Sequence, residues 1–373
     1  MIDRSNFFTN IAKGGEAGFH GGGGYAYGGA IYSSATLAAK ACLFQGNQAL
    51  AGNGTTVPQG GTKGVDGSGG AFCNSGSALI ESCSICYNSV VGGSSFGYAF
   101  STANGGDAFG GGIFNLSQLT VTNSTIAINS ANGGSGSGTG GAKGISGSVL
   151  GGGVFNNTNA TTITVNLTLA SNVCVSPSYP SSDSGIAAGS QIANTNGTLR
   201  LHSSAIAGTN NAYGPITDDG YNISSDGTAQ LFGGTSFNFT DPKLGPLGNY
   251  GGPTLCMSLL PDSPAIDYAD SLSFPPTDQR GYIRPIGDGP DVGAFEYGSH
   301  PAGVTYLSLA ATGGTLTLSF TANPSTVYVL QSSANFATWA NLNTNGPYAT
   351  STNINQAIAT QGFGARFFRL LVN

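Results

Sequence analysis

The chain has 373 residues, of which 62 are glycine and only 8% are charged. An average domain has about 7% glycine and about 25% charged residues. The glycines do not recur at every third position, which excludes a collagen triple helix. With 39% apolar residues and a net charge of −6, ordinary disorder is excluded as well. Few Glu and Lys residues are present to cover helix surfaces, so we expect a strand-rich protein punctuated by glycine.

Charge divides the chain into three segments. Residues 1–180 carry five acidic and five basic groups, residues 181–300 carry 12 acidic and four basic groups, and residues 301–373 carry only two arginines. So few basic residues argue against a nucleic-acid partner. No apolar run reaches the roughly 18 residues of a transmembrane helix, and no signal peptide is visible. A composition rich in Ser, Thr, Asn and Gly and poor in Lys nevertheless predicts a secreted or cell-surface protein. Because the first recognisable coil begins abruptly near Gly28, we expect the natural N-terminus to lie further upstream.

Internal repeats give the strongest signal. Four similar segments begin at residues 28, 69, 110 and 151, at intervals of 41 residues, and a weaker copy begins at Ala188. The first four begin with Gly-Gly and the weaker copy with Ala-Gly. All continue in short runs that alternate apolar and small polar residues, a pattern typical of strands between tight turns. Equal spacing predicts stacked coils in which like residues lie about 4.8 Å apart. The predicted fold is all-β: a right-handed parallel β-helix (solenoid) followed by a small antiparallel β-sandwich-like domain.

Asparagine recurs at one position of the repeat, at Asn47, Asn88, Asn129 and Asn172. An amide can donate to one stacked neighbour and accept from the other, so these residues predict an asparagine ladder. Lys40 aligns with Glu81, which predicts an opposite-charge step between neighbouring coils. Cys42 aligns with Cys83, which allows either a thiol stack or a disulfide. The spacing of the six cysteines fixes no pairing.

Between the strand-rich parts lie glycine-rich segments at residues 52–68, 92–109 and 133–150. We interpret them as loops that project from one corner of each coil. A second, glycine-rich coil in each repeat is the alternative, although the first segment offers little apolar surface for burial. Loops stacked along one side of a solenoid form a surface, and loops commonly carry function.

Several motifs resemble known families. The segments LLPDSPAIDYAD (259–270), TDQRGYIRP (277–285) and GPDVGAFEYG (289–298) resemble the end of bacterial choice-of-anchor Q proteins. The GGAI and FQGN elements (28–31 and 44–47) are similar to the repeat of polymorphic outer-membrane autotransporter passengers. The C-terminal segment resembles a small β domain found on secreted proteins of Verrucomicrobia-like bacteria. These resemblances imply a β-helical, secreted or surface-attached bacterial protein.

Three parts follow from these observations. We expect a β-helix over residues 1–215, an acidic segment that closes it over residues 216–300, and a small β domain over residues 301–373. Trp339 in the last part has two interpretations, a core residue of that domain or part of a sugar-stacking platform, and its aromatic neighbours favour the core.

Two acidic groups are candidate sites. The first is Asp218, Asp219 and Asp226, which could bind a cation such as calcium or a sugar; turn formation is the favoured interpretation because of the neighbouring Gly and Asn residues. The second contains Asp267, Asp278, Arg280, Arg284, Asp291 and Glu296. We interpret it as an Asp–Arg network that closes the last coil, with Arg280 and Arg284 paired to Asp267 and Asp291. A calcium site is the alternative.

The leading functional hypothesis is non-enzymatic. It describes a surface solenoid that presents its glycine-rich loops for adhesion or for binding polysaccharides and host or cell-surface glycans. One alternative is a carbohydrate-active β-helix enzyme, either a polysaccharide lyase or a glycoside hydrolase. Another is a structural surface protein that associates end to end through unpaired strand edges. No catalytic residue and no cofactor are predicted.

Overall fold

The computed structural model describes residues 1–18, 22–57, 60–96, 102–138, 143–178, 182–300, 308–312, 315–322, 327–335, 337–346, 352–359 and 367–372. These residues form strands and irregular segments, and none of them belongs to a helix that is long and apolar enough to cross a membrane. The chain forms two compact units, Met1–His300 and Pro301–Asn373.

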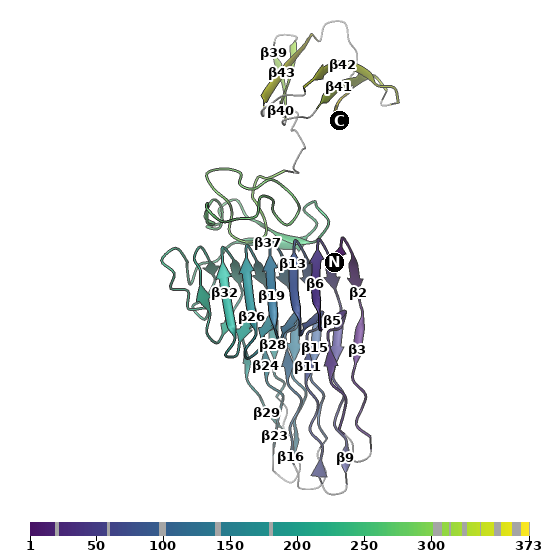
Figure 1. Ribbon diagram of the computed structural model, residues 1–373, viewed down its shortest axis with the longest axis vertical. Coiled ribbons are helices and arrows are strands. Elements are labelled where there is room, and N and C mark those ends of the chain that lie inside the picture. Colours follow the sequence, from purple (N-terminus) through teal and green to yellow (C-terminus); the bar gives the residue numbers. More distant parts are fainter. Residues whose placement is uncertain are drawn as a thin grey trace. The chain divides into compact units, whose positions relative to one another are not determined.

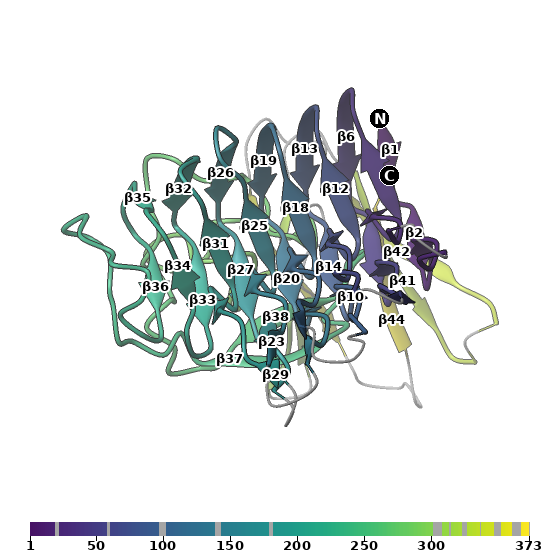
Figure 2. The same ribbon diagram turned by 90° about the horizontal axis from the view of Figure 1, so that it is seen from below.

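Five main parallel sheets build the first unit, and each of the four equally spaced repeats contributes one strand to every one of them. The first sheet contains β4 (Ala26–Tyr27), β11 (Gly67–Ser68), β17 (Ala108–Phe109), β24 (Val149–Leu150) and β30 (Ala187–Ala188). The second contains β5 (Ile31–Ser33), β12 (Phe72–Asn74), β18 (Ile113–Asn115), β25 (Val154–Asn156), β31 (Ile192–Asn194) and β34 (Ala212–Tyr213). Figure 2 shows the strands of successive repeats side by side, for example β12, β18, β25 and β31.

The three other parallel sheets continue each repeat. The third contains β1 (Ile2–Asp3), β6 (Thr36–Lys40), β13 (Ser77–Glu81), β19 (Gln118–Thr122), β26 (Thr161–Val165), β32 (Thr198–His202) and β35 (Thr217–Asp218). The fourth contains β2 (Asn6–Phe8), β7 (Leu43–Gln45), β14 (Ser84–Cys86), β20 (Thr125–Ala127), β27 (Thr168–Ala170), β33 (Ala205–Ala207) and β36 (Ile223–Ser224). The fifth contains β3 (Ile11–Lys13), β8 (Gln48–Leu50), β15 (Ser89–Val91), β21 (Ser130–Asn132) and β28 (Val173–Val175).

The spacing of the repeat sets the register of these sheets. Phe72 pairs with Ile31 on one side and with Ile113 on the other, so residues 41 positions apart are direct neighbours. Their side chains belong to one continuous apolar core that runs through the repeats. Parallel pairing continues past residue 215, where we expected the stack to end, as far as Ile223 and Ser224 of β36.

The first glycine of each Gly-Gly pair makes a turn that other residues disfavour. These glycines, at positions 28, 69, 110 and 151, have φ values of 60°, 71°, 65° and 70°. Gly189, which Ser190 follows in the weaker copy, has a φ value of 65°. A Cβ atom on Gly110 would lie 2.1 Å from the carbonyl oxygen of Ile113. Only glycine fits this turn, which explains why a glycine occupies this position in every repeat.

The glycine-rich segments form paired extended legs, which Figure 1 shows running from the sheets toward β9 (Thr56–Val57) and β16 (Thr102–Ala103). We call the paired stretches 14–18 with 22–24, 52–57 with 60–66, 92–96 with 102–106, and 133–138 with 143–147 the glycine legs. Further short strands lie along them: β10 (Gly60–Gly61), β22 (Ser137–Gly138), β23 (Gly144–Ile145) and β29 (Ser182–Asp183).

Backbone hydrogen bonds link the glycine legs in a continuous zigzag. The N–H of Gly93 donates to the carbonyl of Val65, that of Gly106 to Gly93, and that of Gly134 to Gly106, at 2.8, 2.8 and 2.9 Å. A Cβ atom on Gly93 would lie 1.9 Å from the carbonyl oxygen of Gly52. The described parts of the glycine-rich segments are therefore two backbone layers in direct contact rather than flexible loops. The glycine-rich loops, to which the adhesion hypothesis assigns ligand contact, include residues 58–59, 97–101 and 139–142, which lie outside the described residues.

Residues 216–300 have two different roles. Ala229 and Leu231 join the main core next to the last strands, and Phe237 forms a bridge with Ile223, so this part covers the end of the stack. Residues 241–300, which we call the strap, include the antiparallel strands β37 (Leu244–Gly248) and β38 (Cys256–Leu259). As described below, the strap follows the flank of the stack.

The second unit contains two three-stranded antiparallel sheets. One is built from β39 (Ser308–Thr312), β40 (Thr315–Ala322) and β43 (Thr352–Ala359), the other from β42 (Ala340–Asn345), β41 (Tyr328–Ser333) and β44 (Phe367–Val372). Tyr328 is fully buried and its ring centroid lies 5.4 Å from that of Phe320. Trp339 is partly buried, and its interpretation as a core residue of this unit stays a prediction.

Candidate functional site

The predicted asparagine ladder is present and is longer than the repeat alignment indicated. The Nδ2 group of each member donates to Oδ1 of the next at 2.8 Å, in the order Asn10, Asn47, Asn88, Asn129 and Asn172. Gln191 accepts from the last of them at 2.7 Å. Because the four repeat members are buried, these bonds satisfy amides that water cannot reach.

A second asparagine ladder runs along the second sheet. It contains Asn74, Asn115, Asn156 and Asn194, joined by Nδ2–Oδ1 hydrogen bonds of 2.8, 2.9 and 2.9 Å. The alignment already places the first three at one repeat position, which was the signal for this ladder. Both ladders hold successive repeats in register and are structural.

Two other aligned pairs meet as the spacing predicts. The Lys40 ammonium lies 2.8 Å from the Glu81 carboxylate on the exposed face of the third sheet. Cys42 and Cys83 are both free thiols, and the backbone N–H of Cys42 donates to Sγ of Cys83 at 3.3 Å. The geometry therefore selects a thiol stack over a disulfide.

The three carboxylates of the first acidic group, Asp218, Asp219 and Asp226, already accept hydrogen bonds or form an ion pair within the chain. Asp218 accepts hydrogen bonds from the N–H groups of Gly220 and Gly233, at 3.0 and 2.6 Å, and from two further side chains. Asp219 pairs with Arg200 through Nε at 2.8 Å and Nη2 at 2.7 Å. Asp226 accepts from the backbone N–H of Asn211 at 3.0 Å. These contacts match turn-forming and pairing roles, and no cluster able to hold a metal occurs among the described residues.

The strap follows the turn between the third and fourth sheets. Its contacts reach four successive repeats at Ser82, Asn123, Asn166 and Ser203, residues with φ values of 53°, 51°, 49° and 47°. For example, Asn123 Nδ2 donates to the carbonyl of Thr277 at 2.8 Å, and Asn166 Nδ2 to that of Asp291 at 3.0 Å. The interpretation that this segment closes the last coil is therefore wrong for residues 241–300.

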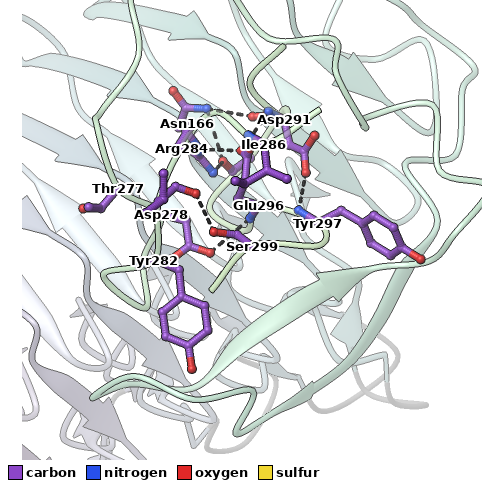
Figure 3. A network of polar contacts seen from close by, with 12 residues as sticks. Asn166, Thr277, Asp278, Tyr282, Arg284, Ile286, Asp291, Glu296, Tyr297 and Ser299 are labelled. Carbon is purple, nitrogen blue, oxygen red and sulfur yellow. Dashed lines mark hydrogen bonds and ion pairs between the residues drawn. The ribbon is translucent and has the colours of Figure 1, made fainter. Parts of the chain in front are cut away.

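Two buried ion pairs organise the strap, and Figure 3 shows the surroundings of the first, between Arg284 and Glu296. Arg284 Nε lies 2.8 Å from Glu296 Oε2, and both side chains are fully buried. The same guanidinium donates to the Gly293 carbonyl at 3.0 Å and to Asn123 Oδ1 at 3.3 Å, which ties the pair to the stack. Arg280 lies 2.6 Å from Asp278 and stacks over the Phe295 ring at 3.7 Å from its centroid. Each charge has several partners, as burial requires.

The expected partners of the two arginines are wrong. Asp267 is exposed and accepts the N–H groups of Asp288 and Gly289 at 3.0 and 3.1 Å. Asp291 accepts the N–H groups of Asp267, at 2.8 Å, and of Tyr297. Backbone N–H groups thus donate hydrogen bonds to these two carboxylates in place of the arginines, because the tight turns around Asp267 and Asp291 direct N–H groups at them.

Burial changes the protonation equilibria of this network. It raises the pKa of Asp291 to about 7, with the neighbouring Glu296 charge as a further cause. Burial likewise raises the pKa of Glu296 and lowers that of Arg284.

The raised pKa of Asp291 predicts that the unfolding free energy depends on pH. The folded state holds a proton on Asp291 between pH about 4 and about 7, where the unfolded state has lost it, so this group makes stability fall as pH rises through that window. We expect the unfolding free energy of the wild type, relative to Asp291→Asn, to decrease by about 1 kcal/mol per pH unit there. Urea unfolding of both proteins between pH 4 and 8 measures this difference. A difference that does not change with pH would contradict the prediction.

An exposed aromatic surface lies at the first strands of the first and second sheets. Tyr25, Tyr27 and Tyr32, which we call the tyrosine cluster, are 60%, 40% and 54% exposed. The Tyr27 ring centroid lies 5.9 Å from that of Tyr25 and 6.1 Å from that of Tyr32. In later repeats the equivalent rings, Phe109, Phe114 and Phe155, stack into an apolar cluster of their own.

Polar groups border the tyrosine cluster. Asp66 directly precedes β11, whose neighbour is β4 with Tyr27, and it accepts the N–H of Asp107 at 2.8 Å. Burial, and after it the charges of nearby groups including Asp66, raises the pKa of Tyr27. Ser75 Oγ donates to the Tyr32 hydroxyl at 3.1 Å. Our sequence reasoning missed this surface, although the alternation Tyr25-Ala-Tyr27 before the first Gly-Gly pair was a signal for it.

Comparisons with protein-family models, with curated proteins and with solved structures yield no match for this chain.

Proposed function

We propose that this chain is a right-handed parallel β-helix protein with a small antiparallel β-sandwich-like domain, secreted or attached to a bacterial cell surface, that binds glycans without altering them. The equal repeats, each contributing one strand to five parallel sheets, support the solenoid part of this proposal. The resemblance of residues 259–298 to the end of choice-of-anchor Q proteins supports the location.

The tyrosine cluster is the observation that carries glycan binding. A pyranose ring has apolar C–H faces and a rim of hydroxyl groups, so it suits a surface with both aromatic rings and hydrogen-bonding groups. Tyr27 and its two neighbours offer three adjacent exposed rings. The Asp66 carboxylate and the tyrosine hydroxyls supply acceptors and donors beside them. Lys63 pairs with Asp66 at 3.4 Å and leaves this surface with little net charge, as a neutral glycan prefers.

The surroundings of the acidic residues support binding over catalysis. A glycosidase needs two carboxyl groups about 5–10 Å apart that are open to the substrate. Asp218 and Asp226 accept hydrogen bonds from backbone N–H groups, and Asp219 pairs with Arg200. The strap carboxylates Asp278 and Glu296 are buried in ion pairs.

Polysaccharide binding by the wild type and Tyr27→Ala tests the proposal. Tyr27 contacts both other rings, so we expect its removal to weaken binding about tenfold, equivalent to about 1.4 kcal/mol. Depletion assays with insoluble cellulose, xylan and chitin, followed by a glycan array, measure the affinity. Tyr213→Ala is the control, because Tyr213 has a similar exposure of 39% at the opposite end of the second sheet. Equal binding by wild type and Tyr27→Ala, or release of soluble sugar, would contradict the proposal.

A further inference from the structure

His202, the last residue of β32, lies against two segments that follow it in the chain. Its Nδ1 atom lies 3.1 Å from the carbonyl oxygen of Asp219, directly after β35. Its Nε2 atom lies 3.4 Å from Oδ2 of Asp270, a residue of the strap. Only 14% of the His202 side chain and 18% of the Asp270 side chain are exposed. The imidazole ring therefore bridges the stack and the strap.

Both of these neighbours are hydrogen-bond acceptors. A carbonyl oxygen can only accept, so Nδ1 must carry the hydrogen of the bond to Asp219. In a neutral ring, Nε2 is then left with a lone pair that faces the Asp270 carboxylate. This nitrogen is buried and finds no hydrogen-bond partner among the described residues. The imidazolium cation has an N–H group at each position and satisfies both acceptors, so the geometry suits the charged ring.

The strap holds the Asp270 carboxylate in a defined position. The N–H of Asp270 donates to Oγ of Ser203 at 3.2 Å, and Asp270 Oδ1 accepts the N–H of Leu272 at 2.9 Å. The second oxygen, Oδ2, faces His202. A hydrogen bond from the charged ring to Oδ2 therefore adds a second link between the strap and the stack, next to the one through Ser203.

The other charged groups near the imidazole neutralise each other. Arg200 lies two residues before His202, on the same face of β32. Its guanidinium donates to the Asp219 carboxylate through Nε at 2.8 Å and through Nη2 at 2.7 Å. Among the described residues, Asp270 is therefore the carboxylate that can offset a positive charge on His202.

Aromatic and apolar side chains complete the surroundings of the imidazole. The Tyr221 ring meets it edge-on, with ring centroids 6.3 Å apart, and Tyr268 of the strap lies 6.2 Å from Tyr221. On β26, the residue paired with His202 is Val165. Such surroundings screen charges less than water does, which strengthens the attraction between a charged His202 and Asp270.

We propose that His202 and Asp270 form a pH-dependent latch between the stack and the strap. Histidine ordinarily changes its charge between pH about 5 and about 8. At the acidic end of this range the imidazolium donates to Asp219 and to Asp270 and holds the strap. As the pH rises, the Nε2 proton leaves, the bond to Asp270 is lost, and the strap opens more easily at this point. The latch involves neither the tyrosine cluster nor the function proposed for it.

Hydrogen exchange of the full chain at about pH 5.5 and about pH 8 tests the latch. The reporter is the amide of Asp270, which donates to Ser203 where the strap meets the stack. Dividing each rate by the intrinsic rate at that pH gives protection factors that can be compared between the two conditions. Asp291 and the other histidines titrate in every variant, so the measured quantity is the ratio of the two protection factors in the wild type relative to the same ratio in a variant.

Two variants each remove one partner. His202→Gln removes the titrating ring, and Asp270→Asn removes the charge while it keeps an oxygen for the N–H of Leu272. We expect the wild-type ratio to exceed that of either variant about fivefold, the effect of a charge-assisted hydrogen bond that water partly screens. The double variant should match the single ones, because both substitutions remove the same bond. Asp262→Asn, which removes the exposed ion pair with Lys243 on the same strap, is the control and should keep the wild-type ratio.

Equal ratios in the wild type and in the two single variants would overturn the latch. A wild-type ratio below theirs would overturn it as well, because the neutral ring would then be the form that holds the strap. An unchanged circular dichroism spectrum establishes that each variant folds. If His202→Gln does not fold, the comparison with Asp270→Asn decides alone, since that substitution preserves the shape of the side chain.

Discussion

Glu296→Gln is expected to destabilise the first unit by about 3–5 kcal/mol, because removing one partner of a buried ion pair leaves the other charge uncompensated. Arg284 is fully buried, and Glu296 is its only carboxylate partner among the ion pairs of the described residues. Glu296 also accepts the N–H groups of Ile286 and Asp291, at 2.7 and 3.0 Å. Losing the charge therefore weakens the whole turn that binds Asn123 and Asn166 of the stack.

Urea unfolding, together with limited proteolysis of residues 241–300, measures this effect. The double variant Arg284→Met/Glu296→Leu is expected to recover much of the stability, since well-packed apolar residues can replace a buried pair. Asp262→Asn is the control: it removes the exposed Lys243–Asp262 pair of the same strap and should leave the unfolding midpoint unchanged. A Glu296→Gln protein as stable as the wild type would show that the pair does not hold the strap.

Gly93→Ala is expected to separate the glycine legs and to cost about 3 kcal/mol, because overpacking between two backbones cannot be relieved by a side-chain rotation. The added Cβ would lie 1.9 Å from the Gly52 carbonyl oxygen and 2.9 Å from the Val65 nitrogen. Gly93 does not have a positive φ, so the effect arises from close approach alone.

Hydrogen exchange and thermal unfolding measure this prediction. The amides of Val65 and Gly106, which donate to Gly52 and Gly93 respectively, should lose protection in Gly93→Ala. Gly15→Ala is the matched control, because no atom lies within 4 Å of its added Cβ. Equal protection in the two variants would contradict direct packing of the two backbone layers.

The repeat made much of the first unit predictable. Like residues at equal intervals must lie on neighbouring strands, so Phe72 beside Ile113, Glu81 beside Lys40 and the ladder from Asn47 to Asn172 follow from the spacing. The turn at Asp218 was also predictable, because Gly220 lies two residues further along the chain and donates its N–H to the Asp218 carboxylate. In each case the partner lies one repeat away or within a few residues.

Contacts made by residues outside the repeats were not predictable from the sequence. Residues 267–296 of the strap carry six carboxylates and two arginines. Composition cannot select Asp278 and Glu296 as partners over Asp267 and Asp291. That choice depends on which backbone N–H groups the folded turns direct at each carboxylate. The same holds for Trp339, whose place beside Arg369 depends on pairing between strands distant in sequence.

The sequence by itself determined the strand-rich class, the repeat length, the register and the turns at each Gly-Gly pair, because a strict period leaves one way to stack identical positions. Only the tertiary structure decided that the glycine-rich segments pack as bare backbone layers, that the strap follows the flank of the stack, and that Tyr25, Tyr27 and Tyr32 share one exposed surface. These features depend on which surfaces meet after folding. Glycine permits a flexible loop and a close backbone contact equally, so only the partner layer distinguishes the two.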